Sequence, residues 1–108
     1  MMQFHTLELA LAAQRALVPR IQRIQRHDRK LAQQMKDATN SFVLNLGEGQ
    51  YSDPGTRRSR YLNSAGSTGE ARAGLRGAVN WGYLKQQEVE EALGHLDRLL
   101  ASLWKLTH

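Results

Sequence analysis

The sequence predicts an all-α protein, folded as an up-down-up-down antiparallel four-helix bundle. Three observations support this fold class. Apolar residues recur every three or four positions along nearly the whole chain, which is the period of one helix face. No stretch shows the apolar–polar alternation of a half-buried strand. The segments between the periodic stretches are short, so neighbouring helices are expected to run in opposite directions.

Four helices are expected in a single domain that spans residues 1–108. They cover residues 4–26, 28–47, 54–80 and 86–106. Asp28 and Asp53 are favourable N-caps for the second and third helices, and Pro54 suits a first helical position. Gly47 or Gly49 should end the second helix, because glycine adopts the left-handed C-cap conformation without strain.

Each expected helix carries an apolar stripe that faces a shared core. The stripes contain Leu7, Leu11, Leu17, Val18, Ile21 and Ile24; then Leu31, Met35, Ala38, Phe42 and Leu46; then Leu62, Ala65, Thr68, Leu75 and Val79; and finally Val89, Leu93, Leu96, Leu100 and Leu103. Gly82 in "WGYL" should end the third helix. Glu88, Glu90 and Glu91 follow in the first turns of the fourth, where acids favour the positive end of the helix dipole.

The composition is that of an ordinary globular chain, with 41% hydrophobic and 23% charged residues. The absence of cysteine excludes disulfides and thiolate chemistry. No apolar run approaches the roughly 20 residues of a membrane helix. The N-terminal "MMQFHTLELA" does not have the pattern of a signal peptide. A cytoplasmic protein without membrane contact is therefore expected.

Positive charge is unevenly distributed in this chain, whose net charge is +5. One group of cations steps by three or four along the end of the first helix and into the next, and a second group lies at the start of the third helix. The first group is Arg20, Arg23, Arg26 and Lys30, and the second is Arg57, Arg58 and Arg60. Such asymmetry favours an acidic partner, RNA or DNA above all. The alternative is that these cations only solubilise exposed helix faces.

The second group of arginines is unusual because cations in the first turn of a helix oppose its dipole, by about 0.3–1 kcal/mol each. This mismatch indicates that Arg57 and Arg58 serve a partner. Alternatively, Asp53 and Glu48 neutralise them locally.

Other functional classes are disfavoured by the motifs. Gly47 and Gly49 follow a helix rather than precede one, so they do not form a phosphate loop. There is no Glu-x-x-His motif for a di-metal bundle and no Gly-x-Ser-x-Gly elbow for a nucleophile. We expect a non-enzymatic protein without cofactor or metal. Trp81 and Tyr83 are expected to pack at a helix corner, and no aromatic residue alternates with the basic stripe to stack on bases.

The third helix is rich in glycine. Its interior glycines are Gly66, Gly69, Gly74 and Gly77. Each costs about 1 kcal/mol of helix stability relative to alanine. Close approach of another helix would offset that cost, either within the bundle or between subunits. We favour a subunit contact, because the four positions cover more than one helix face.

Three motifs, "NLGEG" (45–49), "RYLNSAGSTGEAR" (60–72) and "WGYL" (81–84), together resemble the four-helix-bundle family of 23S rRNA intervening-sequence proteins. The resemblance spans about residues 28–100, although Gly47 stands where the family motif has alanine. It implies a cytoplasmic bundle assembled as a homopentamer, hence a homo-oligomeric ring. Similar bundles act as accessory proteins of diversity-generating retroelements, where they bind a reverse transcriptase and nucleic acid through a basic surface.

The polar residues that match the family motifs are Asn45, Glu48, Asn63 and Glu70, together with Arg60. We interpret them as a buried structural network in which Glu48 or Glu70 pairs with Arg60 or Arg72. The alternative, a carboxylate pair for acid–base chemistry, lacks a nucleophile. The sequence thus favours an oligomeric nucleic-acid-binding or accessory bundle, and the alternative function is a protein–protein interaction scaffold.

Overall fold

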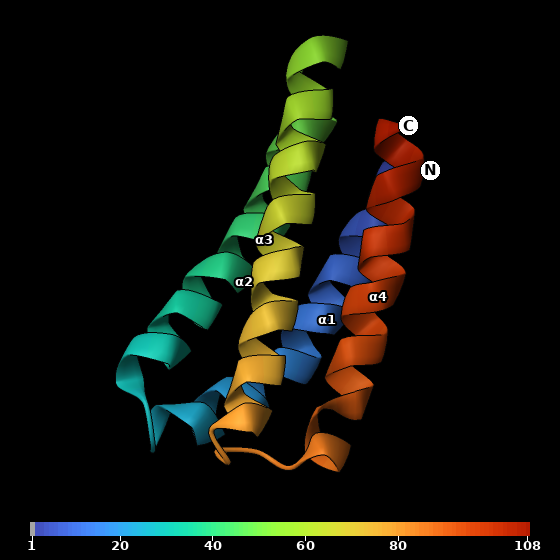
Figure 1. Cartoon of the computed structure of the whole chain (residues 1–108). Helices are drawn as coiled ribbons and strands as arrows, with labels where there is room; N and C mark the ends of the chain where they lie inside the picture. The colour runs from blue at the N-terminus through green and yellow to red at the C-terminus, as the bar shows by residue number, and fades with distance from the viewer. Residues whose placement is uncertain (1) are drawn as a thin grey trace.

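The computed structural model describes residues 2–108, with side chains from His5 onward, and it consists of α-helices. The helices are α1 (Met2–Gln25), α2 (Arg29–Gln50), α3 (Pro54–Asn80) and α4 (Gln86–Thr107). Each helix packs mainly against two others, in the closed order α1, α2, α3, α4 and back to α1. Figure 1 shows the α1–α2 and α3–α4 connections at one end of the molecule and both termini toward the other. The predicted all-α fold with four helices is confirmed.

Carboxylates accept hydrogen bonds at the starts of three helices; Asp28 and Asp53 were predicted to do so, whereas Glu88 was expected only to favour the dipole of α4. Asp28 Oδ1 accepts a hydrogen bond from the backbone N–H of Leu31 (2.9 Å), and Asp53 Oδ1 accepts one from that of Thr56 (3.0 Å). At the start of α4, Glu88 Oε1 accepts the backbone N–H of Lys85 (2.8 Å). Each bond satisfies a donor that has no partner inside its helix.

The predicted end of α2 is wrong, whereas that of α3 is confirmed. Gly82 has a φ of +79° just after α3. Helix α2, however, runs through Gly47 and Gly49 to Gln50. Gly49 is required for close packing instead: a Cβ there would lie 2.5 Å from Cε1 of the buried Tyr61 ring, whereas a Cβ at Gly47 would have nothing within 4 Å.

The core lies along the axis of the bundle and is built from all four helices. Its large buried side chains include Leu17, Ile24, Met35, Phe42, Leu46, Tyr61, Leu75, Leu96, Leu99 and Leu103. The predicted stripes of the second and fourth helices are buried or half-buried as expected. Val18 and Leu62, which were predicted to face the core, are exposed.

Leu62 is exposed because α3 turns Tyr61, rather than Leu62, into the core, while Thr68 and Leu75 of the predicted stripe are buried as expected. The buried face is Tyr61, Ser64, Thr68, Ala71, Leu75 and Ala78. Two hydroxyls enter the core with their hydrogen bonds satisfied: Ser64 Oγ donates to Phe42 O (2.9 Å), and Thr68 Oγ1 donates to Ser64 O (2.7 Å). A satisfied hydroxyl is inexpensive to bury. The Tyr61 ring takes the interior position next to Leu62, although its buried hydroxyl has no hydrogen-bond partner among the described residues.

Substitutions at the two glycines of α2 should have opposite effects. Gly49→Ala should lower the free energy of unfolding by about 1–2 kcal/mol, since the new methyl overpacks against the buried Tyr61 ring. Gly47→Ala, two residues away in open space, should raise it by up to about 1 kcal/mol through helix propensity. Urea denaturation of both variants measures the difference. Equal effects at the two positions would contradict the close approach of Tyr61.

Stability should fall in acid through two capping carboxylates. The pKa of Asp53 is lowered chiefly by the backbone N–H of Thr56, and that of Glu88 chiefly by the backbone N–H of Lys85. A lowered pKa contributes stability above the ordinary carboxyl pKa, which is lost as the pH falls through the lowered value. The double variant Asp53→Asn/Glu88→Gln should therefore lose less stability than the wild type between pH 7 and about pH 3 in denaturant titrations. Glu70→Gln, at an exposed position, is the control and should leave the wild-type pH dependence in place.

Candidate nucleic-acid interface

Two arginines at the start of α3 hold the ends of neighbouring helices. Arg57 donates from Nε to Gly49 O (3.2 Å) and from Nη2 to Ser52 O (2.9 Å), and Arg58 donates from Nε to Thr107 O (3.2 Å). Carbonyls at a helix C-terminus lack partners within the helix and carry the negative end of its dipole. The mismatch with the α3 dipole is thereby explained, because these cations cap the ends of α2 and α4.

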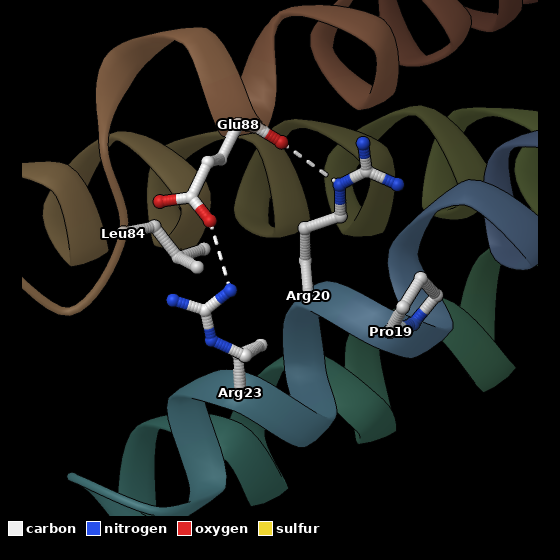
Figure 2. Close-up of a pocket in the computed structure, with 5 residues that line it drawn as sticks. All are labelled: Pro19, Arg20, Arg23, Leu84 and Glu88. Atoms are coloured by element: carbon white, nitrogen blue, oxygen red, sulfur yellow. Dashed lines mark hydrogen bonds and ion pairs between the residues drawn. The ribbon is translucent and has the colours of Figure 1, made fainter.

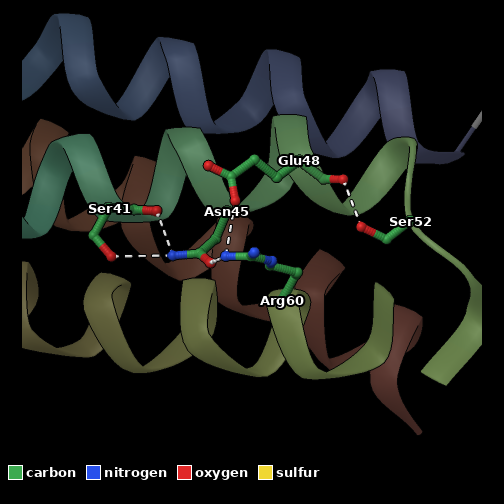
Figure 3. A network of polar contacts seen from close by, with 5 residues as sticks. All are labelled: Ser41, Asn45, Glu48, Ser52 and Arg60. Carbon is green, nitrogen blue, oxygen red and sulfur yellow. Dashed lines mark hydrogen bonds and ion pairs between the residues drawn. The ribbon is translucent and has the colours of Figure 1, made fainter. Parts of the chain in front are cut away.

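Arg60 belongs to a polar network between α2 and α3 (Figure 3). Its Nη1 lies 2.8 Å from Glu48 Oε2 and 3.5 Å from Asn45 Oδ1. Asn45 Nδ2 in turn donates to Ser41 O (2.9 Å), and Ser52 Oγ donates to Glu48 O (2.9 Å). The Arg60 and Glu48 side chains are 42% and 53% exposed, so this network lies at the surface, and the prediction of a buried network is wrong. An ion pair this exposed contributes about 0–1 kcal/mol, so its main effect is to align the two helices.

Two residues predicted for this network lie outside it. Asn63 and Glu70 are exposed, and neither side chain forms a hydrogen bond or ion pair with any of the residues 5–108. Arg72 pairs through Nε with Asp97 Oδ1 (2.7 Å) rather than with Glu70. Asn63 and Glu70 lie on the exposed side of α3, so their side chains do not join the network with Asn45 and Glu48 of α2.

Arg20 and Arg23 join α1 to the start of α4 (Figure 2). Arg20 donates from Nε to Glu88 O (2.9 Å) and from Nη1 to Ala16 O (2.9 Å), while its Nη2 lies 3.3 Å from Glu91 Oε1. Arg23 Nη1 lies 2.9 Å from Glu88 Oε2. Both guanidinium groups are thus already paired with carboxylates of α4.

Among the cations that no described residue pairs, four lie close together in sequence on the α1–α2 connection and on α2, apart from Arg15, Arg76, Lys85 and Lys105. Arg26 and Lys30 remain from the predicted set, and the structure adds Arg29 and Lys36, which were not predicted. All four side chains are exposed, and none forms an ion pair or side-chain hydrogen bond with another described residue.

A groove lined by polar side chains together with Val18, Ile21 and Ala32 runs between α1 and α2, and Arg29 and Lys36 are part of its lining. Two adjoining hollows of about 310 and 270 Å³ share Ile21, Gln25 and Lys36. Their polar lining consists of Gln14, Gln22, Gln25, Arg29, Gln33, Lys36, Thr39 and Asn40. No carboxylate lines either hollow; Asp37 lies beside them and accepts a hydrogen bond from Gln33 Nε2 (2.9 Å). Side-chain amides both donate and accept, so this surface can bind phosphates and hydrogen-bond to base edges.

The spacing of residues in the sequence indicates the α2 side of this groove. Arg29, Gln33, Lys36 and Asn40 follow one another at steps of three and four, so they share one face of α2. Which face of α1 lies opposite them depends on how the two helices pack. The sequence alone therefore could not pair these residues with the amides of α1.

An apolar patch occupies another part of the α1–α2 surface. An open hollow of about 660 Å³ is lined there by Leu7, Leu11, Val43, Leu44 and Tyr51, next to Glu48 and Arg60. Leu44 is 59% exposed and Tyr51 87% exposed. Clustered apolar side chains at a surface are typical of protein–protein contacts.

The glycines of α3 divide into two groups. Gly74 packs inside the bundle, since a Cβ there would lie 2.8 Å from Cγ of Met35. At Gly66, Gly69 and Gly77 a Cβ would meet nothing within 4 Å. No close approach within the chain therefore explains these three.

The expectation that Trp81 packs in a helix corner is wrong. Its side chain is 72% exposed, although Tyr83 beside it is half-buried. The short α3–α4 connection leaves the indole outside the bundle because Leu84, and not Trp81, fills the core at this point.

Within the described residues, no group of three His, Asp or Glu side chains is arranged to hold a metal ion. His95 lies with Nδ1 2.9 Å from Arg98 Nη2. No helix in the described part of the chain is long and apolar enough to cross a membrane.

Comparison with known proteins identifies a fold and no function. No protein-family model matches the chain, and no curated protein matches it either. One solved structure is similar, the crystal structure of a protein of unknown function from the S23 ribosomal protein family of Bacteroides thetaiotaomicron VPI-5482. It superposes with a TM-score of 0.81 over 99% of this chain and 98% of that chain, at 12% sequence identity. At this identity the likeness shows a shared fold alone.

Proposed function

We propose that this protein is a non-enzymatic, cytoplasmic, up-down-up-down antiparallel bundle that self-associates and binds nucleic acid through the α1–α2 surface. The observation that carries the proposal is the contrast between two sets of cations. Arg20, Arg23, Arg57, Arg58 and Arg60 are engaged by carboxylates or helix-end carbonyls. Arg26, Arg29, Lys30 and Lys36 are exposed, without such partners among the described residues, and Arg29 and Lys36 line a groove that no carboxylate lines.

One copy offers about four phosphate contacts, which predicts weak binding that depends strongly on salt. Each phosphate neutralised on duplex DNA changes the slope of log K against log salt by about −0.9. Several copies in one assembly would multiply the contacts on a single strand and raise the apparent affinity by avidity. Self-association is supported by the open space beside three α3 glycines and is implied by the family resemblance.

A second candidate function, a protein–protein interaction scaffold, is supported by the apolar patch around Leu44 and Tyr51. That patch and the polar groove occupy different parts of the α1–α2 surface. The two functions are therefore separable by mutation.

Removing two groove cations should weaken binding and its salt dependence. Arg29→Gln/Lys36→Gln should reduce affinity for a 20-base-pair duplex and lower the salt slope by about 0.9 per lost contact, measured by fluorescence anisotropy between about 50 and 200 mM salt. Arg76→Gln/Lys105→Gln is the matched control, because it removes the same charge from exposed positions on α3 and α4. Equal losses in the two variants would mean that only net charge matters. Absence of binding by folded wild-type protein at low salt would rule out the function.

Adding methyl groups to the outer face of α3 should disrupt self-association. Gly66→Ala/Gly69→Ala/Gly77→Ala should reduce the mass measured by light scattering toward the 12.2 kDa of one chain, since the added Cβ atoms separate the packed backbones. Gly94→Ala on α4, where a Cβ would make only an ordinary contact, is the control. If the mass stays that of the wild type while the melting temperature rises, these glycines face solvent and the contact lies elsewhere.

A further inference from the structure

Three aromatic rings on the α1–α2 and α3–α4 connections lie nearly parallel. Figure 1 shows these two connections at the same end of the bundle. Tyr83 is common to both contacts. Its ring centroid lies 5.2 Å from that of His27 with an interplanar angle of 5°, and 6.4 Å from that of Trp81 with an angle of 15°. The Tyr83 hydroxyl donates to Asp28 Oδ2 (3.2 Å), which fixes the shared ring between the two connections.

The exposed indole of Trp81 is held by an ordered turn. The backbone N–H of Trp81 donates to Gly77 O (3.0 Å), and that of Tyr83 donates to Ala78 O (2.9 Å). Gly82, with its φ of +79°, makes the turn between them. Trp81 thus presents a large apolar ring, 72% exposed, whose orientation is set by the backbone and by its neighbour Tyr83.

The charges around these rings favour an anionic ligand. Arg26, Lys30 and Lys85 are exposed on the two connections that carry the rings or on the helix turns beside them, and no ion pair joins them to a described residue. The acids at this end have partners within the chain: Asp28 accepts from Leu31 N and Tyr83 Oη, Glu90 accepts from Gln86 Nε2 (3.0 Å), Glu88 is paired with Arg23, and Glu91 with Arg20.

We propose that an unpaired base of single-stranded RNA or DNA stacks on Trp81 while Arg26, Lys30 and Lys85 contact the flanking phosphates. This inference rests on the proposed nucleic-acid binding and narrows it to single strands. Aromatic side chains bind single strands because every base has a π-face, whereas a duplex keeps those faces within its own stack. The parallel alignment of the three rings lets one base extend an existing stack.

The chain carries its own matched control at the opposite end. Trp104 is 61% exposed and stacks on His108, with ring centroids 4.4 Å apart. Arg58 at that end donates to the carbonyl of Thr107 and is not free to contact phosphate. Substitution of Trp104 therefore removes an equally large exposed indole without affecting the proposed site.

The test compares labelled 20-nucleotide oligo(U) and oligo(dT) with a 20-base-pair duplex by fluorescence anisotropy at low salt. Trp81→Ala should weaken binding of the single strands by about 5- to 150-fold, the range for one lost stacked base. Its salt slope and duplex affinity should be unchanged, because no charge is lost. Trp81→Phe should retain most of the affinity, and Trp104→Ala should bind like the wild type. In Trp104→Phe, whose only tryptophan is Trp81, either oligonucleotide should quench the intrinsic fluorescence, whereas in Trp81→Phe the remaining Trp104 should not respond.

The possible results separate this inference from the function on which it rests. Unchanged single-strand affinity in Trp81→Ala, with normal duplex binding, overturns the stacking site and leaves nucleic-acid binding in place. Failure of the wild type to bind any of the three probes overturns both. A lower oligomer mass with unchanged single-strand affinity would assign Trp81 to a protein contact, and this also overturns the site. Circular dichroism of each variant verifies that the helices are intact.

Discussion

Burial of one apolar seam shared by four helices is the constraint on which the rest of the structure depends. Phe42 and Leu46 from α2, Tyr61 and Leu75 from α3, and Leu96 from α4 are all fully or almost fully buried. Burying such side chains contributes about 1.5–3 kcal/mol each, which outweighs any single polar contact at the surface. The seam therefore decides how the helices are rotated, even at the expense of an exposed Leu62. The packing of the core thereby sets which polar side chains at the surface lie close enough to form hydrogen bonds and ion pairs.

The distribution of the arginines follows from that packing. Because the start of α3 lies beside the ends of α2 and α4, Arg57 and Arg58 meet carbonyls that have no helical partner. Because α1 lies beside the start of α4, Arg20 and Arg23 meet Glu88 and its backbone. An arginine at a helix junction thus joins two helices when the neighbouring helix offers it a carboxylate or a free carbonyl. It is available to a ligand only where the neighbouring helix offers neither.

The proposed function depends on exposed cations that have no acidic partner within the described residues and on an aromatic ring that lies outside the core. The α1–α2 groove combines free cations with amides, and the nearby end of the bundle holds Trp81 in an ordered turn. Phosphate contacts depend on charge, and base stacking depends on an exposed ring face. The two kinds of contact are borne by different residues, so their contributions can be measured separately. The apolar patch at Leu44 and Tyr51 leaves room for a protein partner on the same surface.

The sequence by itself determined the four helices, the capping carboxylates Asp28 and Asp53 and the turn at Gly82. These features depend on local spacing and on the preferences of single residues, which neighbours in the chain are sufficient to define. The tertiary structure alone decided that Gly49 packs under Tyr61, that Asn63 and Glu70 lie apart from Asn45, and that Trp81 is exposed. It also decided which arginines are free. The physical reason is that helix rotation is set by the sum of many buried contacts between segments far apart in sequence, and in α3, where small residues cover several faces, the sequence pattern favours no single rotation.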